Sequence, residues 1–394
     1  MSPSPWSERL AFAQAERERL GIRRQRRVVE RREGRRVFVD GRPLIDFCSN
    51  DYLGLADHPA AIAALQAAAT QGLGSGGSAL LGGHHPRHAA FEREAAEWLG
   101  HERALFFPSG YQANLAVLQG LLAPGDRCVQ DKLNHASLLD AARLAGGELR
   151  RYPHADAAAA SRQLQAQPAA LSVLATDGVF SMDGDIAPLP ALARIAAEAQ
   201  ALFLVDEAHG VGVLGPEGRG ACAAAGLGAT MVPLRVLPLG KAFGAQGALV
   251  LGDVALIEHL LQSARPYLFS TAALPALAAA LSANLQALRR ASDRREQLHR
   301  QVARFRDRAQ RLGLPLLDST TPIQPLLLGG NARALALAEA LEQRGYWAAA
   351  VRPPTVPEGK ARLRITLTAR HEDSAIDGLL DALAASLERI GREA

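Results

Sequence analysis

The chain has 394 residues, of which 48% are hydrophobic and 21% are charged, and its mean hydropathy is −0.01. This length fits two or three domains of roughly 100–200 residues each, and the composition is that of a folded globular protein, so a small scaffold and a disordered chain are both excluded. The apolar runs end before the ~18 residues that a membrane span requires, and the first ten residues contain no apolar signal core. We therefore expect a cytoplasmic protein.

The basic charge is concentrated at the N-terminus. The formal net charge is +4, yet residues 1–36 contain eleven arginines and five glutamates, so the remainder of the chain is slightly acidic. This segment offers only Trp6 and Phe12 as aromatic side chains for stacking on bases, which argues against nucleic-acid binding. RNA binding stays as an alternative. Its affinity would depend on this segment and would fall steeply with added salt.

Cysteine and lysine are both rare in this chain. The cysteines are widely spaced and form no CxxC pair, so the sequence predicts neither a disulfide framework nor a metal site. Only three of the 44 basic residues are lysines, which leaves few candidates for amine chemistry. The cysteines are Cys48, Cys128 and Cys222, and the lysines are Lys132, Lys241 and Lys360.

From about residue 100, short apolar runs alternate with Ala/Leu-rich amphipathic stretches. This alternation predicts a mostly parallel β-sheet covered by helices on both faces, which is an α/β fold. The predicted strands lie within 103–110, 127–131, 171–178, 201–210, 235–240 and 247–252, and the predicted helices lie within 111–122, 135–146, 188–200 and 253–264.

The C-terminal part has a different pattern. A turn-rich stretch at 267–275 precedes one long helical pattern over 274–312, and apolar runs then alternate with helical stretches up to a final helix from about Asp373. These features predict a smaller α+β domain. We expect an N-terminal arm over 1–45, a large domain over 46–285 and a small C-terminal domain over 286–394.

Two segments suggest how a phosphate-bearing group would be held. Gly72, Gly74 and Gly77 have G-x-G-x-x-G spacing, but they follow a helical pattern, whereas a dinucleotide fingerprint follows a strand. We therefore predict no Rossmann site there. The segment PSGYQAN at 108–114 does lie between a strand and a helix, and free N–H groups at such a helix start suit phosphate. Its candidate residues are Ser109, Gly110 and Tyr111, and an ordinary junction without a ligand is the alternative.

Asp206 ends an apolar run in VDEAHG, and His209 follows three residues later. A buried carboxylate needs a cation or a hydrogen-bond donor, and open α/β sheets bind ligands at the ends of their strands. A pyridinium nitrogen would satisfy Asp206, while His209 could reach a neighbouring oxygen. The alternative is a structural aspartate beside an ordinary histidine.

Lys241 lies among small residues in LGKAFGAQG, whereas Lys132 and Lys360 lie in polar turns. A lysine in such a pocket can form a Schiff base, because desolvation keeps part of the amine neutral; anion binding is the alternative. Together with the phosphate-binding turn, Asp206 and a histidine at His135 that could stack on a ring, Lys241 completes the residues that pyridoxal phosphate requires.

Motifs along nearly the whole chain resemble those of the α-oxoamine synthases, a family of fold-type I pyridoxal phosphate-dependent enzymes. The last motif is similar in particular to the members that act on a pimeloyl thioester. The motifs are FCSNDYLGL (47–55), GSGGS (74–78), HAAFE (88–92), SGYQAN (109–114), NHASLLDA (134–141), TDGVFSMDGD (176–185), VDEAHGVGVLG (205–215), GKAFG (240–244) and RPPTVPEGKARLRITLTARHE (352–372).

The resemblance implies a role for each matching residue. Lys241 would bind the cofactor's aldehyde, Asp206 would pair with the pyridine nitrogen, and His135 would stack on the ring. Ser181 and His209 would address the phenolic oxygen. The phosphate would be held by Gly110 and Tyr111 with Ser270 or Thr271 of a neighbouring subunit, because the family's sites lie at a homodimer interface. The expected substrate contacts are Arg24, with Arg23 as an alternative, His135, Arg352, Thr355 and Arg364.

One position departs from the family pattern. Three residues before the catalytic lysine the family usually has a threonine that donates to the phosphate, whereas this chain has Pro238. The phosphate contact at that position therefore stays open.

The implied reaction is the decarboxylative condensation of L-alanine with a pimeloyl thioester, carried by coenzyme A or acyl carrier protein, in biotin biosynthesis. A sister enzyme that uses glycine or a different thioester, such as 2-amino-3-ketobutyrate ligase, is the main alternative. A non-catalytic binding subunit is a further one, although the presence of Lys241, Asp206 and both histidines speaks against it.

Overall fold

The computed structural model describes residues 4–166 and 169–393 and divides into two compact units. The large unit comprises residues 50–181 and 185–296. The small unit joins the residues up to 49 with residues 182–184 and those from 297 onward. The residues that we expected to form a separate N-terminal arm thus group with the C-terminal part. The expected domain boundaries near 45 and 285 stay a prediction.

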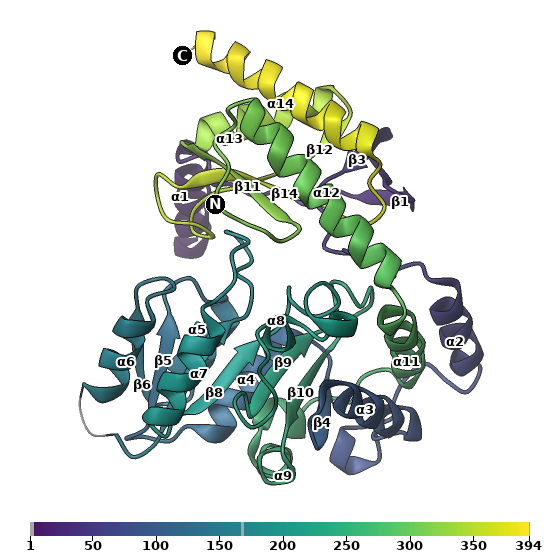
Figure 1. Ribbon diagram of the computed structural model, residues 1–394, viewed down its shortest axis with the longest axis vertical. Helices are drawn as coiled ribbons and strands as arrows, with labels where there is room; N and C mark the ends of the chain where they lie inside the picture. Colours follow the sequence, from purple (N-terminus) through teal and green to yellow (C-terminus); the bar gives the residue numbers. More distant parts are fainter. Residues whose placement is uncertain (1–3, 167–168, 394) are drawn as a thin grey trace. The chain divides into compact units, whose positions relative to one another are not determined.

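The large unit is built on a seven-stranded sheet with the order β4-β10-β9-β8-β7-β5-β6 (Figure 1). Only β10 runs antiparallel to its neighbours, which confirms the mostly parallel sheet. Because β10 reverses direction relative to both β9 and β4, the carboxyl ends of β4, β5, β7, β8 and β9 meet at one edge. The strands are β4 (Arg103–Phe107), β5 (Arg127–Asp131), β6 (Glu148–Tyr152), β7 (Ser172–Asp177), β8 (Leu202–Asp206), β9 (Leu234–Pro238) and β10 (Ala248–Gly252).

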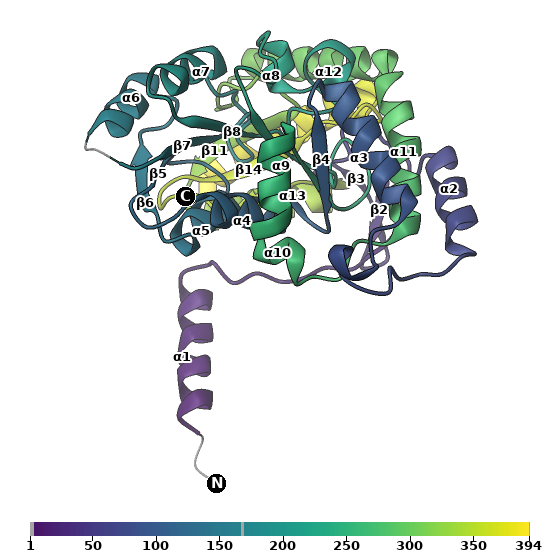
Figure 2. The same ribbon diagram turned by 90° about the horizontal axis from the view of Figure 1, so that it is seen from below.

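Helices cover both faces of this sheet. On one face, α4 (Gly110–Leu121), α5 (Ala136–Leu144), α9 (Val254–Ser263) and α10 (Arg265–Leu268) pack against strand residues such as Leu105 and Val236. Figure 2 shows α6 (Ala157–Gln165) and α7 (Leu189–Glu198) on the opposite face. The remaining helices of the unit are α2 (Pro59–Ala69), η1 (Ala79–Leu81), α3 (Pro86–Leu99), η2 (Pro216–Gly218), α8 (Ala221–Ala224) and α11 (Pro275–Arg289).

Two parts of the chain differ from the sequence-based expectation. The edge strand β6 was not predicted, because its sequence ELRRY is largely polar. The single helical pattern over 274–312 forms two helices, α11 and α12 (Ser292–Arg311). At the break, Arg295 donates to the carbonyl oxygen of Leu288 at 2.7 Å, and this contact satisfies one of the carbonyl groups that a helix end leaves without a partner.

The small unit contains two separate sheets. Val37, Val39 and Leu44 form a compact apolar cluster between the N-terminal strands. These strands were not predicted from the sequence, because they are short and bury few side chains. One sheet has the order β1 (Val29–Glu33), β2 (Arg36–Val39), β3 (Arg42–Asp46), β12 (Tyr346–Trp347), and the other has the order β11 (Ile323–Gly329), β14 (Ala361–Thr366), β13 (Ala349–Val351).

The part of α12 from residue 297 onward, α13 (Asn331–Gln343) and α14 (Asp373–Glu393) complete the small unit. The first helix, α1 (Pro5–Arg19), buries none of its side chains, and Figure 2 shows it standing apart from the strands of its unit. Within the described part of the chain, no helix combines the length and the apolar character needed to cross a membrane.

A buried ion pair joins β8 and β9 beside the shared strand edge. Glu207 accepts a hydrogen bond from Arg235 at 2.8 Å and also accepts from the backbone N–H groups of Ala221 and Cys222. The side chains of Glu207 and Arg235 are only 0% and 4% exposed. Removing one partner would therefore leave an unpaired charge in the interior, which is costly.

We expect Glu207→Ala to lower the free energy of unfolding by about 3–5 kcal/mol, because Arg235 would stay buried without its partner. The matched control is Glu198→Ala in α7, because Glu198 makes an exposed ion pair with Arg194. This substitution should lower the free energy of unfolding by less than about 1 kcal/mol. Urea unfolding followed by circular dichroism measures both. Equal losses in the two variants would contradict the assigned importance of the buried pair.

Candidate active site

A cavity of about 160 Å³ opens in the large unit at the carboxyl edge of the sheet. Open α/β sheets bind their ligands at this edge. Most of the cofactor-binding residues expected from the sequence line this cavity, together with several residues that were not expected. The lining residues are Gly110, Tyr111, Asn114, His135, Ser137, Asp177, Ser181, Asp206, Ala208, His209, Pro238 and Lys241.

Asp206 is the buried carboxylate of this cavity, with 4% of its surface exposed. One oxygen accepts from the backbone N–H of Ala208 at 2.9 Å, and the other accepts from Asn114 Nδ2 at 2.8 Å. A buried carboxylate needs donors in place of water, and these two groups supply them. The strand end therefore presents a fixed negative charge to the cavity.

Asn114 and Ser137 connect this carboxylate to His135. Asn114 Nδ2 also donates to Ser137 Oγ at 2.8 Å, and Ser137 Oγ lies 2.8 Å from His135 Nδ1. Since Ser137 Oγ accepts from Asn114 and the backbone N–H of Ser137 donates to His135 Nδ1, Nδ1 is the acceptor. The proton of the neutral ring is therefore on Nε2.

His135 caps the N-terminus of α5 while its ring remains accessible from the cavity. The surrounding walls desolvate the ring and lower the pKa of His135; the nearby Asp206 acts in the opposite direction and Lys241 reinforces the lowering. A neutral imidazole with a flat open face is suited to lie against an aromatic ring.

Asp177 is a site residue that our sequence reasoning missed. It is the register partner of Asp206 at the end of the neighbouring strand β7, and its Oδ2 accepts from the backbone N–H of His135 at 3.1 Å. Burial and the charge of Asp206 raise the pKa of Asp177 well above its usual range. The rule that selected Asp206, an aspartate ending an apolar strand, would also have selected Asp177.

His209 is held by a tyrosine that the sequence analysis had not singled out. Its Nδ1 lies 2.5 Å from Tyr52 Oη in a buried hydrogen bond, and Tyr52 is fully buried. This contact fixes the ring of His209 in the cavity wall. Ser181 also lines the cavity, from the segment that follows β7.

Lys241 is the one lysine of the three that lines the cavity, whereas Lys132 and Lys360 are exposed at the surface. It follows β9 in a turn closed by a 2.8 Å hydrogen bond from the backbone N–H of Gly244 to its carbonyl oxygen. The amine is therefore carried by a compact turn at the same edge as Asp206.

Helix α4 begins at the cavity. Ser109 caps the helix by accepting from the backbone N–H of Gln112 at 3.3 Å, and Gly110 and Tyr111 follow in the first turn. Tyr111 donates its hydroxyl to Asp140. The ring of Pro238 packs directly on Gly110, where a Cβ atom would lie 2.6 Å from Pro238 Cγ. Pro238 stands where the family usually has a threonine, and it has no group that could donate to a phosphate. Its contribution to the start of α4 is therefore steric.

Ser270 and Thr271 do not line this cavity. They line a separate, much smaller one of about 20 Å³ in the large unit, and Gln112 donates to Ser270 Oγ at 2.6 Å. The segment containing Thr271 pairs with Ser78 through an isolated bridge.

A second cavity of about 300 Å³ lies within the small unit and is lined by three of the expected substrate residues, Arg24, Arg352 and Thr355. Arg24 donates to Thr355 Oγ1 at 2.7 Å, and Arg352 donates to the carbonyl oxygen of Gly21. Burial and the nearby charge of Arg24 lower the pKa of Arg352. Among the described residues that line this cavity there is no carboxylate, so it attracts anions.

Two other arginines expected near the substrate, Arg23 and Arg364, do not line the second cavity. Arg23 pairs with Glu18 at 2.6 Å on the surface and does not line the second cavity. Arg364 is buried in β14, where it donates to Thr366 Oγ1 at 2.9 Å, and it lines neither cavity. Arg24 is thus the arginine of the N-terminal segment that faces the anion-attracting cavity.

The first cavity has the groups that pyridoxal phosphate requires. A helix start offers N–H groups for a phosphate, Asp206 offers a buried charge for a pyridinium, and Lys241 offers the amine. Asn114 Oδ1 and Asp177 Oδ1 are buried acceptors without a hydrogen-bond partner among the described residues. The fold and this cavity together define a pyridoxal phosphate-dependent α/β enzyme.

Comparison with known proteins agrees with this class. The family model for class I and II aminotransferases matches residues 42–383. The chain is 57% identical over 384 residues to the 8-amino-7-oxononanoate synthase of Stenotrophomonas maltophilia, covering 97% of this chain and 94% of that one, and 54% identical to that of Xylella fastidiosa, covering 94% and 93%. The chain belongs to the class I and II aminotransferases and, within them, to the 8-amino-7-oxononanoate synthases.

Solved structures show the same fold. A serine palmitoyltransferase from S. paucimobilis with a bound PLP–myriocin aldimine aligns with a TM-score of 0.94 at 27% identity, covering 99% of this chain and 100% of that one. An 8-amino-7-oxononanoate synthase from Francisella tularensis aligns with a TM-score of 0.78 at 32% identity, covering 88% and 98%.

The close packing of Pro238 on Gly110 leads to a prediction. Gly110→Ala should weaken binding of pyridoxal phosphate by about 1–3 kcal/mol, because the added methyl group forces the start of α4 away from Pro238. Titration of the cofactor by absorbance measures the loss. Gly228→Ala, where a Cβ would meet nothing within 4 Å, is the control. The double variant Gly110→Ala/Pro238→Gly should recover much of the affinity, and a failure to recover would contradict the steric explanation.

Proposed function

We propose that this protein joins the α-carbon of L-alanine to the carbonyl carbon of a pimeloyl thioester and forms 8-amino-7-oxononanoate in biotin biosynthesis. The carbon–sulfur bond of the thioester breaks to release the thiol, the alanine carboxylate leaves as carbon dioxide, and a proton takes its place on the α-carbon. The observation that carries this proposal is the meeting of Lys241, Asp206 and His135 in one cavity, in a chain 57% identical to a curated 8-amino-7-oxononanoate synthase.

Each cavity residue receives one role in this proposal. Bound pyridoxal phosphate supplies an electron sink for the negative charge that develops on the substrate's α-carbon. Asp206 keeps a proton on the ring nitrogen, supported by its donors Asn114 and Ala208. Lys241 Nζ anchors the cofactor and then takes the α-proton of alanine. His135 stacks on the ring through its neutral face.

The other proposed contacts complete the cofactor site. Ser181 and His209 bind the phenolic oxygen, and the hydrogen bond between Tyr52 and His209 supports the histidine ring. Ser109, Gly110 and Tyr111 bind the phosphate at the start of α4, where the helix dipole favours an anion.

We assign Ser270 and Thr271 to the phosphate of a second copy in a homodimer. Leu81 and Phe269 are 82% and 72% exposed beside these residues. Large apolar side chains exposed on adjacent segments favour a protein–protein interface, which supports the homodimer.

The small unit supports recognition of an anionic acyl substrate. A pimeloyl chain ends in a carboxylate, or in its methyl ester if the carrier route masks it, and coenzyme A and acyl carrier protein both carry phosphate. Arg24 and Arg352 offer two guanidinium groups in one cavity, and guanidinium binds carboxylate and phosphate well. Thr355 and Arg364 are the further substrate contacts of this proposal.

The cytoplasmic location expected from the sequence is part of the same proposal. The three cysteines are free thiols in the structure, and two of them are buried. Free thiols fit a reducing compartment.

The roles of Lys241 and Asp206 can be separated by following exchange of the α-proton of alanine with solvent deuterium by NMR. Lys241→Ala should abolish both exchange and the covalent attachment of the cofactor that borohydride reduction traps in the wild type. Asp206→Asn should retain the trapped attachment but slow exchange by about 10²–10³-fold, as expected for loss of a preorganised charge. Normal exchange in Asp206→Asn would contradict its role, and a label on Lys132 or Lys360 would contradict that of Lys241.

The acyl substrate is tested with Arg24→Ala and the control Arg23→Ala. Arg24→Ala should raise the KM for the pimeloyl thioester about tenfold, the value of a charge-assisted hydrogen bond, and should leave alanine α-proton exchange unchanged. The effect should shrink with added salt, which screens exposed charges.

The same assay distinguishes the alternatives. Thiol release is compared for pimeloyl and acetyl thioesters on both carriers. Equal turnover of the two acyl groups by the wild type would contradict the pimeloyl assignment and favour a 2-amino-3-ketobutyrate ligase. An unchanged KM in Arg24→Ala would contradict only the role of Arg24.

A further inference from the structure

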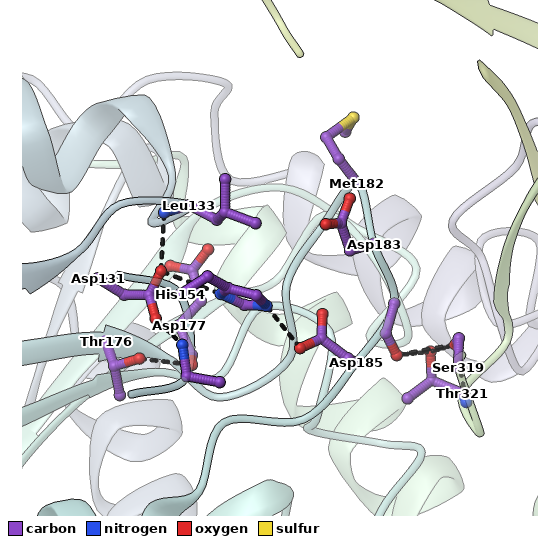
Figure 3. A network of polar contacts seen from close by, with 12 residues as sticks. Asp131, Leu133, His154, Thr176, Asp177, Met182, Asp183, Asp185, Ser319 and Thr321 are labelled. Atoms are coloured by element: carbon purple, nitrogen blue, oxygen red, sulfur yellow. Dashed lines mark hydrogen bonds and ion pairs between the residues drawn. The ribbon is translucent and has the colours of Figure 1, made fainter. Parts of the chain in front are cut away.

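His154 lies between two carboxylates outside the cavity (Figure 3). Its Nδ1 is 3.0 Å from Asp131 Oδ1, and its Nε2 is 2.8 Å from Asp185 Oδ2. Because a carboxylate can only accept, both ring nitrogens carry protons and the ring is an imidazolium. Burial alone would lower the pKa of His154, but the hydrogen bonds that the ring donates to Asp131 and Asp185 outweigh burial and raise the pKa to about 10.

The first carboxylate, Asp131, fixes the turn that leads to His135. Asp131 ends β5 and is 1% exposed. Its Oδ1 also accepts from the backbone N–H of Leu133 at 2.8 Å, and its Oδ2 accepts from the backbone N–H of Ala155 at 2.8 Å. The turn held by the contact with Leu133 continues directly into His135 in the cavity wall.

The second carboxylate, Asp185, belongs to the segment that carries Ser181. The carbonyl oxygen of Asp185 accepts from the backbone N–H of Phe180 at 3.0 Å, and Val179 and Ile186 form an isolated bridge. These contacts close the segment at its base, one residue before Ser181. The ring of Phe180 stands edge-on to the imidazolium, with ring centroids 4.4 Å apart.

We propose that His154 is a positioning residue that joins the two cavity walls carrying His135 and Ser181. It touches neither of these side chains and acts through Asp131 and Asp185. Groups that orient the residues of a site are required for its precision, since small displacements of the contacting side chains are costly. The inference rests on the cofactor site proposed above.

His154→Ala would leave two carboxylates facing each other without the positive charge between them. Both walls should then loosen. In the full-length protein, with and without pyridoxal phosphate, hydrogen–deuterium exchange should rise within 132–137 and within 178–186, while the core strands keep their protection. The dissociation constant of pyridoxal phosphate should rise about tenfold, as expected for loss of a hydrogen bond to a charged group. The visible circular dichroism of the protein saturated with cofactor should decrease.

Two further variants test the electrostatic explanation. His154→Ala/Asp185→Asn removes one of the facing charges, so it should recover part of the protection within 178–186. His101→Ala is the matched control, because His101 is a buried histidine of the same unit whose ring nitrogens have no hydrogen-bond partner among the described residues. It should lower the melting temperature without changing the cofactor's affinity or its circular dichroism.

Unchanged exchange in either wall, or a cofactor affinity and dichroism equal to those of His101→Ala, would overturn the proposal. A double variant no better protected than His154→Ala would overturn its electrostatic basis. If borohydride reduction of the wild type instead labels a residue other than Lys241, the proposed site is wrong, and that outcome is distinct from a failure of His154.

Discussion

The burial of one negative charge, Asp206, is the constraint on which the organisation of the large unit depends. A carboxylate in the interior is tolerated only where donors replace water. Asn114 reaches it from α4, Ala208 from the turn after β8, and Ser137 continues the chain of hydrogen bonds to His135. A single charge thereby sets the orientation of a helix, a turn and a histidine ring.

The direction of the strands brings these groups within reach of one another. Because β10 is antiparallel to both β9 and β4, β4 points the same way as the parallel strands, and its end delivers the start of α4 to the edge that also carries Asp177 and Asp206. A phosphate-binding helix start, two carboxylates and the turn of Lys241 therefore meet at one edge. Reversal of a single strand is the topological feature that makes this possible.

The two cavities have opposite electrostatic character. In the large unit, burial and the adjacent Asp206 both raise the pKa of Asp177, so the carboxylate of Asp206 is the group suited to a cationic ring. In the small unit, Arg24 and Arg352 share a cavity whose described lining has no carboxylate, so their mutual repulsion is relieved by an anion. A cationic heterocycle and an anionic acyl substrate are the two chemistries that these walls suit.

The sequence by itself determined the class of fold and the main reactive groups. The alternation of apolar runs and amphipathic stretches is a local signal, so it revealed the mostly parallel sheet, and the scarcity of lysine singled out Lys241. Only the tertiary structure decided what supports them. Asn114 meets Asp206 across 92 positions and Arg24 meets Thr355 across 331, and no local pattern encodes such pairings. The N-terminal strands were likewise missed because their cluster closes only when the strands pair, since the stability of so small a sheet comes from packing and not from the intrinsic propensity of its residues.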